Sequence, residues 1–248
     1  MWHASCFNPL AMKKTLIILA IGSGLSLSQA QAEIESEFHV GYNSDYVFRG
    51  LNLGEDAYEY GLNFAGSSSS GLDWSAGLWG VSPSGGVTGE TDVYASVSKD
   101  LGEVSVAAGF TTYTYEDGAA HDSELSLGIS GEAYGFDVGA TAFFGTEGAV
   151  DEQVLIEGSL AQSYELNDTT NLNAGLVIGY VSDAGLGGYA TDNGVAYYAV
   201  TLSLDVTLSD DISLSPYVAY VDGDGGTIAD VGSIEDGVIG GVKVSMSF

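Results

Sequence analysis

The sequence is poor in cysteine and in basic residues, and each shortage excludes a class of protein. Its single cysteine, Cys6, lies near the start of the chain, so no disulfide framework can hold the fold together. Five Lys and Arg residues stand against 34 Asp and Glu residues, and the formal net charge is −29. Because nucleic acids are bound through cations that neutralise phosphates, we expect no nucleic-acid partner.

Long apolar runs are missing beyond residue 32. A membrane-spanning helix needs roughly 20 apolar residues, and no later segment approaches that length. The one long run, 16–25, follows the basic pair Lys13-Lys14 and precedes Ala30-Gln31-Ala32, which is the pattern of a secretory signal peptide. We therefore interpret the chain as an upstream mis-start over 1–11, a signal peptide over 12–32 that is cleaved after Ala32, and one domain over 33–248.

What the sequence does contain is a repeated unit of about ten residues in which apolar and polar side chains alternate, followed by Gly, Asp, Asn or Ser. Such alternation is typical of strands with two different faces. Along 196–208, for example, Leu202 faces one way and Ser203 the other. About twelve strands are predicted: 36–50, 57–65, 72–81, 91–99, 103–115, 123–130, 136–144, 153–166, 171–181, 194–208, 212–221 and 237–248.

These strands predict an all-β fold that closes on itself. In lipid, an open sheet edge would leave a row of backbone N–H and C=O groups without partners. We therefore predict a closed antiparallel transmembrane β-barrel of about 12 strands, with outer-membrane lipid against its apolar face. The 36 Gly and 15 Tyr residues suit such a wall.

The connections support the same fold, because bacterial barrels have short periplasmic turns and longer external loops. Short turns are predicted at 66–71, 100–102, 131–135, 167–170 and 209–211, and longer loops at 82–90, 116–122, 182–193 and 222–236. Outward aromatic residues predict two interfacial belts. The periplasmic belt contains Phe64, Trp74, Phe136, Tyr164 and Phe248, and the external belt Tyr58, Tyr60, Phe144, Tyr180, Tyr198 and Tyr220.

The chain ends in a strand whose alternation is in phase with its last residue, Phe248. Bacterial outer-membrane proteins commonly end in such a strand with a C-terminal aromatic residue. This resemblance implies that Phe248 is the assembly signal and that the barrel-assembly machinery is a partner.

The first predicted strand carries a longer motif. Residues 40–50 read Val-Gly-Tyr-Asn-Ser-Asp-Tyr-Val-Phe-Arg-Gly. This resembles the N-terminal signature of the TorF-type porins, in which a Gly-Tyr-x-Ser-Asp-Tyr-x-Phe-Arg-Gly run opens the mature barrel. The resemblance implies an outer-membrane channel and assigns no solute to it.

The inward faces supply the candidate site residues. Arg49, the only arginine, shares the inward face of the first strand with Asp45 and should be paired with a carboxylate, for which the candidates include Asp45 and Glu59. Arg49 then either clamps the first strand to the second or contacts solutes at a constriction, and we favour the clamp. Further inward carboxylates are Asp73, Asp92, Glu124, Asp137, Glu157 and Asp205.

Rings of acidic residues favour the passage of cations, although a hydrated lining that screens its own charge is the alternative. We predict a monomeric, cation-preferring passive channel for small hydrophilic solutes. A lumen filled by side chains or by a segment of chain would instead favour a non-conducting structural or adhesive barrel. A soluble periplasmic or secreted β-protein is a third alternative.

We predict no catalytic residue, cofactor or metal site. No Gly-x-Ser-x-Gly elbow accompanies His39 or His121. The acidic run 222–226 lacks the spacing of an EF-hand.

Overall fold

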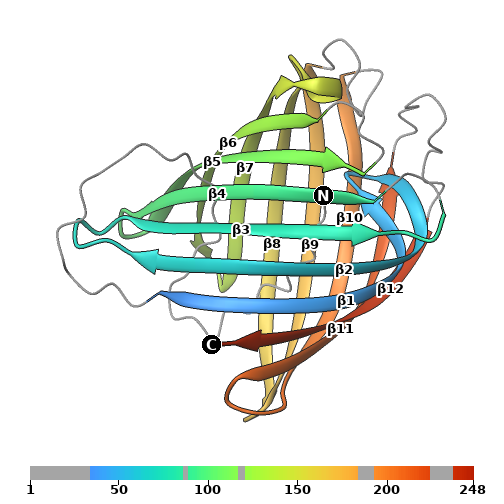
Figure 1. Ribbon diagram of the computed structural model, residues 1–248. Helices are drawn as coiled ribbons and strands as arrows, with labels where there is room; N and C mark the ends of the chain where they lie inside the picture. Colours follow the sequence, from blue (N-terminus) through green and yellow to red (C-terminus); the bar gives the residue numbers. More distant parts are fainter. Residues whose placement is uncertain (1–33, 86–88, 117–120, 184–192, 224–236) are drawn as a thin grey trace.

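The computed structural model describes residues 34–85, 89–116, 121–183, 193–223 and 237–248. These residues form a closed barrel of twelve antiparallel strands in which each strand pairs with its neighbours in sequence and β12 pairs with β1 (Figure 1). The strands are β1 Glu35–Phe48, β2 Leu51–Ser67, β3 Asp73–Ser82, β4 Glu90–Asp100, β5 Val104–Tyr115, β6 Asp122–Ala133, β7 Phe136–Glu147, β8 Val154–Asn167, β9 Thr170–Asp183, β10 Gly194–Thr207, β11 Ile212–Gly223 and β12 Gly237–Ser247. A short 3₁₀ helix, η1 Gly148–Val150, lies between β7 and β8.

This architecture confirms the predicted all-β fold, its closure and its twelve strands. No helix in the described ranges is long and apolar enough to cross a membrane. The predicted mis-start and signal peptide, 1–11 and 12–32, lie outside the described residues, as does the greater part of the acidic run 222–226.

The two faces of the wall differ as the alternation predicts. On β10, Val200 and Leu202 are 46% and 48% exposed, whereas Ser203 and Asp205 are 6% and 5% exposed. The apolar face therefore points outward and the polar face into the lumen. Of the eleven belt residues, Trp74, Phe136 and Tyr220 are half-buried and the other eight are exposed.

The two ends of the barrel have different connections. The end that carries both termini, here the terminal end, has connections of two to five residues. At the opposite end, here the loop end, five of the six connections are six to thirteen residues long. The predicted sorting of short turns and long loops is therefore confirmed, with one exception: β1 and β2 are joined by the two residues Arg49 and Gly50.

The last strand closes the barrel. Ser247 on β12 lies opposite Glu37 on β1, and the backbone N–H of Phe248 donates to Ser36 O at 3.1 Å. Phe248 is 69% exposed on the outside. Its predicted position, outward at the terminal end, is correct.

The β1–β2 connection departs from the predicted wall. We expected the second strand to begin at Ala57, but it begins at Leu51, so β1 and β2 continue beyond the neighbouring strands and fold into the barrel (Figure 1). We call residues 46–54 the inner hairpin. Its residues are buried on both faces: Tyr46, Val47, Phe48, Arg49, Leu51 and Leu53 are each no more than 6% exposed.

Local backbone geometry explains the turn and the bend. Arg49 and Gly50 have φ angles of 48° and 82°, and two consecutive positive φ values are what a tight two-residue hairpin of type I′ requires. The β1–β2 register shifts between Tyr46 and Val47, at the base of the hairpin. Such irregularities bend a strand and increase its twist, and this one lies where the chain leaves the wall.

Candidate functional site: the lumen and the inner hairpin

The inner hairpin packs against opposite sides of the lumen. Tyr46, Phe48, Leu51 and Leu53 form one buried cluster with wall residues of β3 and β5, among them Trp79, Val81 and Tyr113. Val47 forms a second cluster with Ala199 on β10 and with Ala219 and Val221 on β11. The hairpin therefore bridges the loop-end half of the lumen and fills it with apolar side chains.

Little space is left beside the hairpin. A cavity of about 20 Å³ lies between it and the wall, lined by Asn43, Asp45, Trp79, Tyr217 and Ile239 among others. A volume of this size holds about one water molecule. The hairpin thus occupies the loop-end half of the lumen, between Trp79 and Tyr113 on one side and Ala199 and Val221 on the other.

Arg49, at the tip of the hairpin, forms a buried bidentate ion pair in the lumen. Its two terminal nitrogens donate to the two carboxylate oxygens of Glu124 on β6 at 2.7 and 2.9 Å. Its Nε lies 3.9 Å from Oε1 of Glu157 on β8. The side chains of Arg49 and Glu124 are only 4% and 2% exposed, so this bidentate pair is shielded from water.

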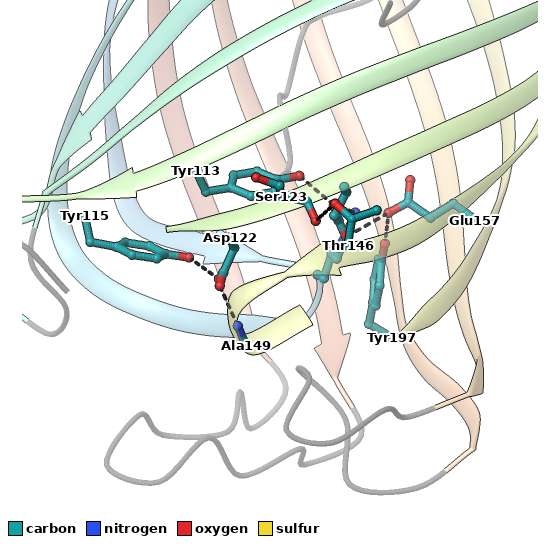
Figure 2. A network of polar contacts seen from close by, with 10 residues as sticks. Tyr113, Tyr115, Asp122, Ser123, Thr146, Ala149, Glu157 and Tyr197 are labelled. Atoms are coloured by element: carbon teal, nitrogen blue, oxygen red, sulfur yellow. Dashed lines mark hydrogen bonds and ion pairs between the residues drawn. The ribbon is translucent and has the colours of Figure 1, made fainter. Parts of the chain in front are cut away.

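Aromatic residues complete the surroundings of the guanidinium. Its central carbon lies 4.5 Å from the ring centroid of Phe143 on β7 and 4.8 Å from that of Phe48. The hydroxyl of Tyr113 donates to Glu124 at 2.7 Å. Tyr197 on β10 donates its hydroxyl to Glu157 on β8 (Figure 2).

Two further carboxylates lie beside the hairpin on β4. Tyr46 donates its hydroxyl to Glu90 at 2.6 Å, and Asp92, two residues further on the same face, is completely buried. The Asp92 carboxyl group lies beside that of Glu90, and the two share a side-chain hydrogen bond.

The predicted partners of Arg49 are wrong. Asp45 instead accepts hydrogen bonds from Ser44 and Asn52, and Glu59 accepts one from Asn43. Contrary to the prediction, Arg49 does not tie β1 to β2; it joins the hairpin tip to Glu124 on β6 and lies near Glu157 on β8. The reason is that the chain turns into the lumen before Arg49, which carries its side chain away from β2 and toward the opposite wall.

The structure brings only some of the predicted inward residues together. Arg49, Glu124 and Glu157 form one contact, and Asp92 lies near it in the same half of the lumen. Asp73 and Asp137 lie at the terminal end, directly after the turns that precede β3 and β7. Asp205 forms a separate network, in which it accepts hydrogen bonds from Asn173 and Ser215 at 2.8 Å each.

Glu90 and Tyr113 were missed as site residues. Glu90 was placed in a predicted loop, although its two-residue spacing from the inward Asp92 was a usable signal. Asp122 was missed for the same reason, since it ended a predicted loop. It accepts hydrogen bonds from the Tyr115 hydroxyl at 2.7 Å and from the backbone N–H of Ala149 in η1 at 2.6 Å, which fixes the rim above the lumen (Figure 2).

A closed antiparallel barrel with an apolar outer face and a polar lumen has the fold of outer-membrane porins, and solved structures show the likeness. The NanC porin is 14% identical, with a TM-score of 0.54 over 85% of this chain and 98% of that one. An outer membrane channel from Pseudomonas putida F1 is 11% identical, with a TM-score of 0.54 over 92% and 100%. The KdgM porin is 11% identical, with a TM-score of 0.51 over 86% and 99%. No family model and no curated protein matches the sequence.

Proposed function

We propose that this protein is an outer-membrane channel for small hydrophilic solutes and that the inner hairpin is its gate. The observation that carries the proposal is the hairpin inside the lumen, whose tip is joined to the wall by a buried ion pair between Arg49 and Glu124. A wall of this kind can conduct once the hairpin leaves, because the inward positions of the strands are mostly small or polar.

Cation preference is part of the proposal. Removal of the hairpin would leave Glu90, Asp92, Glu124 and Glu157 facing the same half of the lumen, and a ring of carboxylates favours cations over anions. Arg49 would leave with the hairpin, which increases the excess of negative charge. The reversal potential of the open channel in a salt gradient measures this preference.

The proposed cellular location and family rest on the sequence. The signal peptide of 12–32, cleaved after Ala32, and the exposed apolar face support an outer-membrane location, with the barrel as a monomer in lipid. The motif that resembles the TorF-type porins ends in Tyr46, Phe48, Arg49 and Gly50, which are residues of the inner hairpin. Membership of that family would make the gate a shared feature.

A non-conducting structural barrel is the second candidate, and one observation favours it. The hairpin is packed as tightly as a protein core, with Phe48 and Leu51 only 2% and 3% exposed. A plug that never leaves would make the barrel a structural or adhesive surface protein. The two candidates differ in whether the hairpin moves.

A reversible crosslink between hairpin and wall tests this difference. The chain from residue 33 onward has no cysteine, so Val47→Cys and Ala219→Cys introduce one thiol on each side of a shared cluster. We expect the oxidised double variant to be silent in planar lipid bilayers and to conduct after reduction. Gel mobility before and after reduction reports whether the disulfide has formed.

Each single cysteine variant is the control, since it cannot form the crosslink. Equal conductance of the oxidised and reduced double variant would show that the hairpin is not the gate. Absence of conductance in every form, including the hairpin-displacing variants Glu124→Ala and Gly50→Val, would favour the structural barrel.

Phe248 is proposed as the assembly signal for the barrel-assembly machinery. Deletion of Phe248 removes an exposed outward ring and one backbone bond to β1, which costs the isolated barrel only about 1 kcal/mol. We therefore expect a large fall in outer-membrane levels in cells together with nearly unchanged heat-dependent gel mobility after refolding in detergent. Phe248→Tyr, which keeps the aromatic ring, is the control. Normal membrane levels of the deletion variant would contradict the role.

A further inference from the structure

The pocket that receives Arg49 belongs almost entirely to the wall. Glu124, Phe143 and Glu157 come from β6, β7 and β8, and only Phe48 comes from the hairpin itself. The pocket would therefore persist if the hairpin left, as a group of wall side chains on three adjacent strands.

These wall residues match a flat, delocalised cation in shape and in charge. Glu124 offers both carboxylate oxygens to the two terminal nitrogens of the guanidinium, at 2.7 and 2.9 Å. Phe143 offers a ring face at 4.5 Å. A bidentate carboxylate with an aromatic face is the arrangement that recognises guanidinium groups and distinguishes them from compact ammonium ions.

The wall also fixes the two carboxylates without help from Arg49. Tyr113 donates to Glu124, and Tyr197 donates to Glu157. Both tyrosines are buried, at 4% and 1% exposed, and lie on the wall strands β5 and β10. The pocket is therefore arranged before a cation arrives, which lowers the entropic cost of binding.

Charge points to a ligand beyond Arg49. The guanidinium contacts two carboxylates, and Glu90 and Asp92 add two more beside the hairpin. One guanidinium group thus lies among four acidic residues. When the hairpin leaves, these residues remain on the wall and attract another cation. The pocket also lies in the loop-end half of the barrel, which under the proposed orientation meets solutes from outside first.

We propose that this wall pocket is a binding site for solutes that carry a guanidinium group, and that Arg49 occupies it as an internal substitute for such a solute. A solute that binds Glu124 and Phe143 displaces the hairpin tip, so the cation to be transported opens its own path. This inference rests on the proposed channel and names the solute class that the gate responds to.

Arg49→Ala empties the pocket and gives the direct test, with propylguanidinium as the probe because it reproduces the arginine side chain. We expect propylguanidinium to raise the thermal unfolding temperature of the Arg49→Ala barrel in detergent, with at least about tenfold tighter binding than neutral propylurea. In bilayers the same probe should raise the open probability of the parent barrel, because it competes with Arg49 for Glu124 and displaces the hairpin tip.

Two further variants make the test specific. Glu124→Gln in the Arg49→Ala background should abolish the thermal stabilisation by propylguanidinium, whereas Asp137→Asn, which changes an inward carboxylate at the terminal end, should leave it intact. If Arg49→Ala does not fold, Arg49→Gln replaces it, since it keeps a long polar side chain without the charge.

The outcomes separate this inference from the proposed function. Equal binding of propylguanidinium and propylurea, or binding that survives Glu124→Gln, would overturn the guanidinium site even if the channel conducts. Selective binding in detergent without conductance of any variant would support the site and overturn the channel.

Discussion

Glu124→Ala is expected to produce a channel that is open most of the time, where the parent barrel is mostly closed. The substitution leaves the Arg49 guanidinium buried beside the remaining Glu157, whose oxygen is 3.9 Å from Nε. Loss of one partner from a buried ion pair costs about 3–5 kcal/mol. Because every 1.4 kcal/mol is a factor of ten, the closed state loses a factor of roughly a hundred to several thousand in population. Single-channel recording measures the open probability directly.

The double variant Arg49→Ala with Glu124→Ala separates the charge from the packing. It removes both charges, so no uncompensated guanidinium remains in the lumen, and we expect an open probability well below that of Glu124→Ala alone. Asp73→Ala is the matched control, because Asp73 is an inward carboxylate at the terminal end that bonds to Ser67 and not to the hairpin. A closed Glu124→Ala channel, or one no more open than Asp73→Ala, would contradict the role of the ion pair.

The wall of the barrel could be predicted from the sequence. When one face of a strand contacts lipid, the alternation of apolar and polar side chains determines which residues point outward. Tyr198, Val200 and Leu202 point outward and their neighbours inward, and a slip of one residue would reverse every one of them. Each strand carries this information by itself, without reference to its neighbours. The strand count, the closure and the two kinds of connection all follow from that local pattern.

The inner hairpin could not be predicted in the same way, although part of its signal was present. Phe48 continues the outward phase of β1, so the strand was interpreted as wall up to Gly50. Val47, Leu51 and Leu53, however, make both faces of this segment apolar. A strand that is apolar on both faces is typically buried on both faces, and in a barrel with lipid on one side this requires the segment to enter the lumen.

The partner of Arg49 could not be predicted from residues near it in the sequence or on the neighbouring strand. Asp45 and Glu59 were chosen because they lie close to Arg49 in sequence or on the neighbouring strand. Glu124 is 75 residues away, on a strand separated from β1 by four others. The pairing depends on how far the hairpin crosses the lumen, which is set by a register shift between Tyr46 and Val47 that the alternation does not encode.

The geometry of the turn gives a second expected result of similar size: Gly50→Val should also open the channel. Gly50 has a φ of 82°, and a Cβ at this position would lie 2.6 Å from the Cβ of Tyr197 and 3.1 Å from the Cα of Gly223. A β-branched residue at positive φ costs about 1–3 kcal/mol, and the overlap with the wall adds about 1–3 kcal/mol. The seated hairpin therefore loses a factor of roughly thirty to twenty thousand in population.

Gly135→Val distinguishes displacement of the hairpin from general backbone strain. Gly135 has a nearly equal φ of 80°, but it lies in the terminal-end turn between β6 and β7 and nothing is within 4 Å of its Cβ position. We expect Gly135→Val to lower the stability of the barrel by about 1–3 kcal/mol and the channel to stay closed. Labelling of a Val47→Cys thiol by a water-soluble reagent should be fast in the Gly50→Val background and slow in the Gly135→Val background, because only the first substitution exposes the buried face of the hairpin. Equal labelling rates in the two backgrounds would contradict this prediction. They would show that the hairpin tip stays in the lumen without the close fit between Gly50 and Tyr197.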